Sequence, residues 1–435
     1  MKKFLSIILT AAILLTTACS DNNVVRYDDT LPQCEPANIS HSQMLNMEYA
    51  TMKGTDGYYY CGNSSVMQGD YTVYYYDKES KTTIPLCAKP QCAHDGNDFC
   101  VATGGKQVMY TLFYNNCIYK LCRENTEEQM YEYKLLKGDK QGNELSVVTE
   151  FLTAPNVQQI NISNVLCHYG VMFFVMEKYN DDNYTNHIYA IDLASGAVKE
   201  IEVSDAARYE QYPFMTADGD YLYFAAEDVT MDKNQTWVRV DADTVMHRYN
   251  LKTGVTEIIS DMPKIYSSFT VNDGVIYYTT VDRGENTFSL VSFDTEKKET
   301  KTLVENRQMV YLDGKYLSEN GMKVSTDRKY LYIRMTCGSG FAEAKDKRGM
   351  EIYIYDMNGK PLYEGLLTAE NPRESEEYRF SAIDGEMYLL CKFWEYDENS
   401  QVKIDEASGL YTIRTDELVK GSKNWQKLYQ VTSYV

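Results

Sequence analysis

Residues 273–279 read DGVIYYT, a two-residue turn followed by a strand-like run of aliphatic and aromatic side chains. Asp-Gly is typical of a tight β-hairpin, whose turn residues take positive φ values. The residues before it (266–272, YSSFTVN) and a little after it (288–294, FSLVSFD) are rich in β-branched and aromatic side chains, which favour strands. The stretch therefore predicts an antiparallel hairpin at Asp273-Gly274.

The same pattern recurs six more times along the chain. The other copies are DGYYYC at 56–61, NNCIYKL at 115–121, YGVMFFV at 169–175, GDYLYFA at 219–225, RKYLYIR at 328–334 and DGEMYLL at 384–390. The aromatic residue at the fifth position returns every 50 to 59 residues, at Tyr60, Tyr119, Phe173, Tyr223, Tyr277, Tyr332 and Tyr388. Repetition at a nearly constant interval predicts copies of one structural unit.

Each unit contains signals for four strands, here called A to D. A strand precedes the tight turn, a second follows it, and a third ends in an acidic or amide residue, as at Asp294, before a short turn and a last strand. Four antiparallel strands at this period predict an all-β fold, a seven-bladed β-propeller of four-stranded antiparallel blades over residues 43–435. A series of β-sandwiches would need repeats of roughly 90–100 residues.

The antiparallel order decides which loops share an end of the ring. The A–B and C–D turns lie at one end, called the turn end, and the B–C loops and D–A connections lie at the other, the loop end. The longer insertions are B–C loops, and variable loops on a rigid scaffold often carry function. Ligand binding is therefore predicted at the loop end, through Tyr179, Tyr184, Phe341, Trp394 and Tyr396. The alternative is that these are ordinary solvated loops.

The stretch CAKPQCAHDGNDFC, from Cys87 to Cys100, contains a concentrated set of metal-binding side chains. The thiols of Cys87, Cys92 and Cys100 and the imidazole of His94 match the ligands of a closed zinc site, so zinc is a candidate cofactor. A disulfide would suit a secreted protein, and reduced thiols would suit an anaerobic organism. In each case the stretch is expected to fasten the D–A connection between blades 1 and 2, at the loop end, rather than to catalyse.

The chain begins MKKFLSIILTAAILLTTACS, with two lysines, an apolar stretch at 4–15 and small residues before Cys19. This is typical of a secretory signal. The end of the stretch resembles the lipobox of bacterial lipoproteins, although Thr16 stands where that pattern prefers Leu. The resemblance implies a signal peptide at 1–18, acylation of Cys19 and a lipidated tether at 19–42. Ordinary cleavage with an unmodified cysteine is the alternative.

The formal net charge of −20 argues against nucleic-acid partners, because phosphates would repel so acidic a chain. Neither a Gly-x-Ser-x-Gly elbow nor a phosphate-binding glycine loop is present. The periodic, tyrosine-rich strands resemble the TolB-like and YWTD-like propeller ectodomains of secreted bacterial lipoproteins, over about residues 43–435. The resemblance implies the fold and a location outside the cytoplasm, at the cell membrane or outer surface.

Three functions are compatible with these features. The first is a membrane-anchored extracytoplasmic lipoprotein whose B–C and D–A loops bind an extracellular protein or carbohydrate, with no catalytic residues. The second is a propeller glycosidase or lyase that uses loop carboxylates, for which a deep acid-lined pocket would be the sign. The third is a scaffold for envelope assembly.

Overall fold

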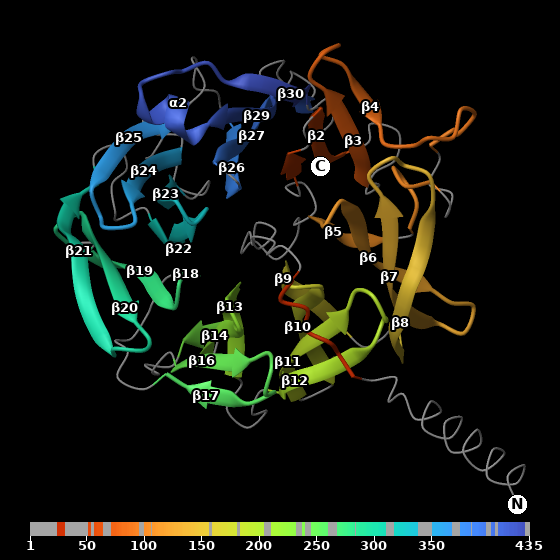
Figure 1. Ribbon diagram of the computed structural model, residues 1–435, viewed down its shortest axis with the longest axis horizontal. Helices are drawn as coiled ribbons and strands as arrows, with labels where there is room; N and C mark the ends of the chain where they lie inside the picture. Colours follow the sequence, from red (N-terminus) through yellow and green to blue (C-terminus); the bar gives the residue numbers. More distant parts are fainter. Residues whose placement is uncertain are drawn as a thin grey trace, which may run out of the picture.

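The computed structural model describes 24–30, 51–53, 56–63, 71–94, 100–105, 107–155, 159–180, 183–203, 210–231, 237–239, 245–259, 268–282, 284–309, 317–337, 350–367, 375–383, 385–396, 402–404 and 408–430. Within these residues the strands form seven antiparallel sheets arranged as blades around a central axis (Figure 1). The prediction of an all-β, seven-bladed propeller is confirmed.

Blades 1 to 3 follow one another in chain order. Blade 1 has β1 (Thr51–Lys53), β2 (Gly57–Asn63), β3 (Tyr71–Asp77) and β4 (Thr83–Pro85). Blade 2 has β5 (Val108–Tyr114), β6 (Cys117–Asn125), β7 (Met130–Asp139) and β8 (Leu145–Pro155). Blade 3 has β9 (Gln159–His168), β10 (Val171–Asn180), β11 (Asn183–Asp192) and β12 (Val198–Val203).

Blades 4 and 5 continue the series. Blade 4 has β13 (Glu210–Asp218), β14 (Tyr221–Met231), β16 (Val245–Asn250) and β17 (Thr256–Ile258), with the short β15 (Trp237–Arg239) paired to β14. Blade 5 has β18 (Phe269–Asn272), β19 (Val275–Asp282), β20 (Thr287–Asp294) and β21 (Glu299–Gln308).

Blades 6 and 7 complete the ring. Blade 6 has β22 (Leu317–Thr326), β23 (Tyr330–Cys337), β24 (Met350–Asp356) and β25 (Pro361–Leu367). Blade 7 has β26 (Ser375–Ile383), β27 (Glu386–Tyr396), β29 (Gly409–Arg414) and β30 (Gln426–Gln430), with β28 (Val402–Ile404) paired to β27 and the short helix α2 (Thr415–Val419) after β29. Among the residues described, no helix has the length and apolarity needed to cross a membrane.

The turns have the chemistry that the repeat predicted. At the A–B turn of blade 5, Asp273 and Gly274 both have positive φ values, 51° and 71°, as a tight hairpin requires. The C strands of blades 1, 2, 3, 5 and 6 end in Asp and that of blade 4 ends in Asn, and this residue organises the C–D turn. The Asp294 Oδ1 atom, for example, accepts hydrogen bonds from the amides of Glu296 and Lys297 at 3.1 and 3.0 Å. Such an Asx turn explains why this position is Asp or Asn in so many units.

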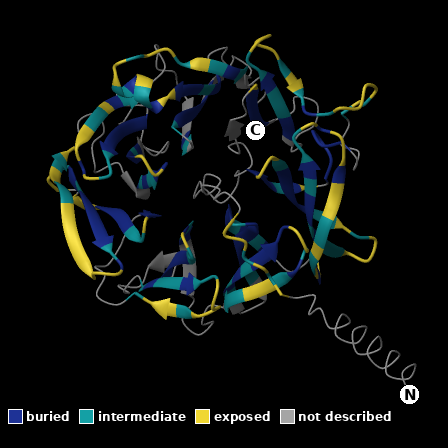
Figure 2. Ribbon diagram, in the orientation of Figure 1, coloured by how far each residue is buried: buried dark blue, intermediate teal, exposed yellow. Residues whose placement is uncertain are grey.

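The core of the molecule lies between blades rather than inside any one of them. Seven clusters of buried apolar side chains can be defined in the described part of the chain, one at each junction of neighbouring blades. The inner strands are buried, whereas the outermost ones are more exposed, as β21 shows (Figure 2). Each blade therefore depends on its two neighbours for a core, which is why a closed ring is the stable arrangement.

Tyrosine suits these junctions because its ring packs while its hydroxyl reaches the next blade. The Tyr110 hydroxyl of blade 2 donates to the Ile162 carbonyl of blade 3 at 2.6 Å. The Tyr332 hydroxyl of blade 6 lies 2.8 Å from the Thr415 hydroxyl of blade 7. These bonds give a structural reason for the 39 tyrosines of the chain.

Within the described strands, the ring closes without a strand shared between its first and last blades. All strands of blade 7 come from the C-terminal end of the chain, and all those of blade 1 from its N-terminal part. The junction is instead a cluster of buried side chains that includes Tyr60, Tyr388 and Leu428. The Thr83 hydroxyl also donates to the Leu428 carbonyl at 2.9 Å. Closure of the ring therefore rests on side-chain packing and hydrogen bonds between blades 1 and 7.

Candidate functional site

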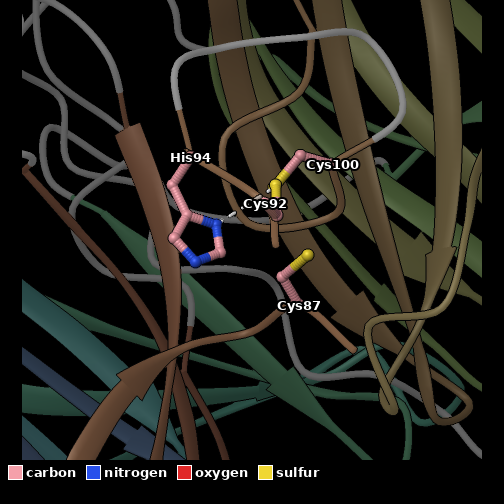
Figure 3. A group of neighbouring side chains, drawn as sticks. All are labelled: Cys87, Cys92, His94 and Cys100. Carbon is pink, nitrogen blue, oxygen red and sulfur yellow. Dashed lines mark hydrogen bonds between the residues drawn. The ribbon is translucent and has the colours of Figure 1, made fainter. Parts of the chain in front are cut away.

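The four predicted ligand residues of the cysteine-rich stretch converge on one point (Figure 3). The sulfur atoms of Cys87, Cys92 and Cys100 and a ring nitrogen of His94 all lie within 4.8 Å of one another. The His94 Nδ1 atom is 3.5 Å from the Cys100 Sγ atom. All three cysteines are thiols in this structure, with no disulfide among them. These four residues are called the Cys3His cluster below.

Both ends of the stretch are held firmly by blade 2. The Ala88 amide donates to the Gly142 carbonyl at 2.9 Å, and a Cβ atom on Gly142 would lie only 2.8 Å from the Cys87 Cα atom. At the other end, the fully buried Lys120 ammonium donates to the carbonyls of Ala102 and Gly104, at 3.1 and 2.8 Å. The cluster is thus built on a fixed frame.

The position of the stretch differs from the predicted one. Gly142 belongs to the C–D turn of blade 2, which is a turn-end element, yet its carbonyl accepts a hydrogen bond from the Ala88 amide, and a Cβ atom on it would meet the backbone of Leu86 and Cys87. The first half of the stretch therefore follows the junction between blades 1 and 2 and does not lie wholly at the loop end. The reason is that β4 has only three residues, so the chain leaves blade 1 halfway along its outer edge.

The thiols of the cluster have different electrostatic surroundings. Burial raises the pKa of the Cys87 thiol. Burial also acts to raise the pKa of Cys100, but hydrogen bonds from Thr103 and His94 to its sulfur outweigh this and lower the pKa. The backbone amides of Lys89 and Thr103 donate to the sulfurs of Cys87 and Cys100. The surroundings of Cys100 can therefore stabilise negative charge on its sulfur.

The predicted ligand-binding aromatic residues are placed only in part. Tyr179 and Tyr184 are partners in the backbone register near the ends of β10 and β11, and Trp394 and Tyr396 lie on β27. These four residues were predicted in loops, but they lie on extended arms of strands that continue past the blade. Phe341 lies outside the described residues. The structure pairs the backbones of Tyr179 and Tyr184, and a role of these residues in ligand binding stays a prediction.

A cavity of about 350 Å³ lies at the turn end, where no site was predicted. It is formed by the turns of blades 3 to 6, and its lining residues are Tyr169, Asp218, Gly219, Asp220, Tyr221, Tyr223, Asp273, Gly274, Thr295, Glu296 and Arg328. Burial raises the pKa of Asp218, whose Oδ2 atom accepts a hydrogen bond from the Gly274 amide at 2.9 Å. The repeated Asp residues of successive A–B turns were the sequence signal for this acidic cavity.

Residues 24–30 lie against the turn end of blades 3 and 4, beside this cavity (red in Figure 1). The Tyr27 hydroxyl donates to the Gly219 carbonyl at 2.8 Å, and the Asp28 amide donates to the Tyr169 carbonyl at 3.1 Å. The Lys252 Nζ atom pairs with a carboxylate oxygen of Asp29 at 3.1 Å. The segment is thus bound to the propeller before the first blade begins.

Comparisons with known proteins found solved structures with a distant likeness to this chain. No protein-family model and no curated protein matches the sequence. Solved structures similar to this chain include prolyl endopeptidases, at 9% identity and a TM-score of 0.46, over 84% of this chain and 46% of theirs. TolB from Acinetobacter baumannii matches at 14% identity and a TM-score of 0.35, over 84% of this chain and 76% of TolB. The β-propeller domain of the Trilobed protease from Pyrococcus furiosus matches at 13% identity and a TM-score of 0.43, over 88% of this chain and 97% of that domain.

The chain spans less than half the length of the prolyl endopeptidases, with 46% of their length covered. At these identities the likeness concerns the fold alone.

Proposed function

We propose that this protein is an extracytoplasmic binding protein, held at a membrane by a lipid on Cys19, whose propeller binds an extracellular protein or carbohydrate at its loop end. The observation that carries the proposal is the position of residues 24–30 on the turn end. Because this segment is bound there, a lipid a few residues upstream would tie the turn end, and not the loop end, to the membrane.

The length of the connection makes this orientation specific. Five residue steps separate Cys19 from Val24, which is the first described residue. A fully extended chain covers at most roughly 3.6 Å per residue, so the two are at most about 18 Å apart. The turn end would therefore rest close to the lipid headgroups. The arms β10–β11, β14–β15 and β27–β28, which extend past the blades in the other direction, would reach away from the membrane.

Anchoring and binding are tested separately. Cells that produce the full chain are fractionated, and a Cys19→Ser variant is compared with the wild type. The wild type is expected in the membrane fraction and the variant in the soluble one. A variant that stays in the membrane would contradict lipid anchoring.

Binding is tested with a soluble form that begins after Cys19, screened against arrays of polysaccharides and secreted proteins. A partner found in this way should bind at least about tenfold more weakly to a Trp394→Ala, Tyr396→Ala double variant, since interface aromatics often contribute more than 1 kcal/mol each. Glu296→Gln is the matched control at the turn end, where the side chain is 74% exposed. Loss of binding in the control alone would place the site in the turn-end cavity instead.

The acidic lining of that cavity favours a second candidate function, cleavage of a polysaccharide. Its most buried carboxylate, Asp218, has a raised pKa, as a general acid needs. However, the Asp218 carboxylate also accepts a hydrogen bond from the Gly274 amide, so it has a structural role in the fold as well. Release of reducing ends or unsaturated products, lost by at least about 100-fold in Asp218→Asn, would support catalysis. If no class of polysaccharide yields any product, catalysis is excluded.

A further inference from the structure

The geometry points to a structural zinc site. Cys87, Cys92, His94 and Cys100 hold a single Zn²⁺ ion in a closed tetrahedral site that fastens blade 1 to blade 2. This inference is independent of the proposed binding function, because it concerns the junction of two blades and not the loop-end arms.

The separations between the ligand atoms are those of a tetrahedron around zinc. Bonds of about 2.3 Å to sulfur and about 2.0 Å to nitrogen place the sulfur and the nitrogen roughly 3.5 Å apart, and two sulfurs roughly 3.8 Å apart. The His94 Nδ1 and Cys100 Sγ atoms are 3.5 Å apart, and all four ligand atoms lie within 4.8 Å of one another. A small movement of each thiol would complete the coordination of one ion.

The surroundings of the sulfurs suit thiolates bound to a metal. The amides of Lys89 and Thr103 donate to the sulfurs of Cys87 and Cys100, and such outer contacts orient and stabilise metal-bound thiolates. His94 has a φ of 51°, an uncommon backbone conformation that needs support from its surroundings. The result of this conformation is that the imidazole faces the three sulfurs (Figure 3).

A disulfide would explain less of this arrangement. It would join two of the three sulfurs and leave the third thiol and the imidazole without a role. Four soft or borderline ligands without a carboxylate among them select zinc over magnesium or calcium, which require oxygen ligands. Because all four positions are filled by protein, the site has no open position for substrate, and its role is structural.

The position of the cluster shows what the metal would fasten. Cys87 follows closely after β4, which has only three residues, so blade 1 has a short outer edge. Cys100 leads into Val101, which is fully buried in the core between blades 1 and 2. One ion therefore joins the end of blade 1 to the chain that enters blade 2. It supplies at this edge the fixation that a longer strand would supply elsewhere.

Binding is a proton-releasing step with a simple balance. Zn²⁺ forms three bonds to sulfur and one to the His94 Nδ1 atom, and each thiol that is protonated beforehand gives its proton to the solvent. The two positive charges of the ion and three thiolates leave one net negative charge at the site. Acid should therefore release the metal, because protons compete with zinc for the ligands.

The test uses the soluble chain that begins after Cys19, purified without oxygen, with metal content measured by elemental mass spectrometry. One zinc ion per chain is expected, with a fall of about tenfold or more in Cys92→Ser. Cys117→Ser is the matched control, because Cys117 is a half-buried cysteine on β6 outside the cluster. It should retain the metal.

A second measurement keeps the proposal testable if Cys92→Ser folds poorly. Metal-free wild-type chain is titrated with Co²⁺, and a tetrahedral site with three thiolates should give intense sulfur-to-cobalt charge-transfer absorption at one equivalent, removed by adding Zn²⁺. If Cys87, Cys92 and Cys100 all react with a thiol reagent, as mapped by peptide mass spectrometry, and no metal is bound, the proposal is overturned. It is also overturned if two of these three thiols react only after reduction, since that would show a disulfide between them.

Discussion

His168 shows how a single buried residue can set the pH range in which the protein is stable. Its side chain is 1% exposed at the end of β9, and its Nε2 atom lies 2.7 Å from the Gly219 carbonyl oxygen. Because a carbonyl can only accept, the ring must carry its proton on Nε2. Burial disfavours the charged form and lowers the pKa of His168 to about 4, with the nearby positive charge of Arg328 acting in the same direction.

We expect this histidine to make the free energy of unfolding fall with pH below neutrality. The unfolded chain takes up a proton near the ordinary pKa of 6.5, whereas the folded chain does so only near 4. The stability contribution is therefore present above pH 6.5 and is lost as the pH falls towards 4. Between about pH 7 and pH 4.5 the loss attributable to His168 should be about 2–3 kcal/mol.

Urea unfolding of the wild type and of His168→Gln at both pH values measures this loss. The glutamine amide keeps a donor for the Gly219 carbonyl but does not titrate, so the variant should lose that much less stability on acidification. Equal pH dependence of the two proteins would mean that His168 is already protonated in the folded state at the lower pH.

At the scale of elements, the sequence predicted the parts of each blade whose chemistry is local. The Asp-Gly and Asn-Asn turns and the Asp residues that end the C strands follow from φ preferences and Asx hydrogen bonds within a few residues. The longer insertions were interpreted as B–C loops. In the structure the β10–β11 ladder continues as far as the pair Asn180 and Asn183, since backbone hydrogen bonds do not require apolar side chains.

The turn around Gly142 gives a prediction at this scale. Gly142 has a φ of +77°, and a Cβ atom there would approach the backbone of Leu86 and Cys87 within 2.9 Å. Gly142→Ala should therefore lower the free energy of unfolding by about 1–2 kcal/mol, because alanine is strained at this positive φ. It should lower it by about 1–3 kcal/mol more, because the new methyl group displaces the backbone of Leu86 and Cys87. Differential scanning calorimetry and metal content should both show the change.

Gly421 provides the control because it has a φ of +91°, while no described atom lies within 4 Å of the position that a Cβ atom would occupy. Gly421→Ala should show the backbone loss alone and leave metal content unchanged. Equal destabilisation of the two variants would mean that the connection yields to the new methyl group without cost.

For the whole molecule, the repeat predicted the number of blades but not how distant blades meet. The ligand set of the Cys3His cluster could be predicted from the sequence because its four residues lie within one stretch. The contact of this stretch with Gly142 could not be predicted, since it depends on how the short β4 ends. The turn-end cavity combines Tyr169, Asp218 and Arg328 from three blades, and only the closed ring brings them together.

The junction of blades 1 and 7 is the part of the fold that the sequence predicts least well, and an experiment on it is the most informative. Leu428 is 3% exposed in β30 and packs with tyrosines of both blades. Leu428→Ala should cost about 2–5 kcal/mol, as buried Leu truncations do. Because none of the described strands is shared across this junction, hydrogen exchange should rise first in β2 and β30 while β10 and β11 stay protected.

Val147 on the outer strand β8 is the control for this last variant, because its side chain is 55% exposed on the far side of blade 2 from the core. Val147→Ala should change stability by less than about 0.5 kcal/mol and leave the exchange pattern unaltered. If Leu428→Ala instead raises exchange equally in all seven blades, the ring unfolds as one cooperative unit. In that case the junction of blades 1 and 7 is as stable as one closed by a shared strand, because it opens only when the other junctions open with it.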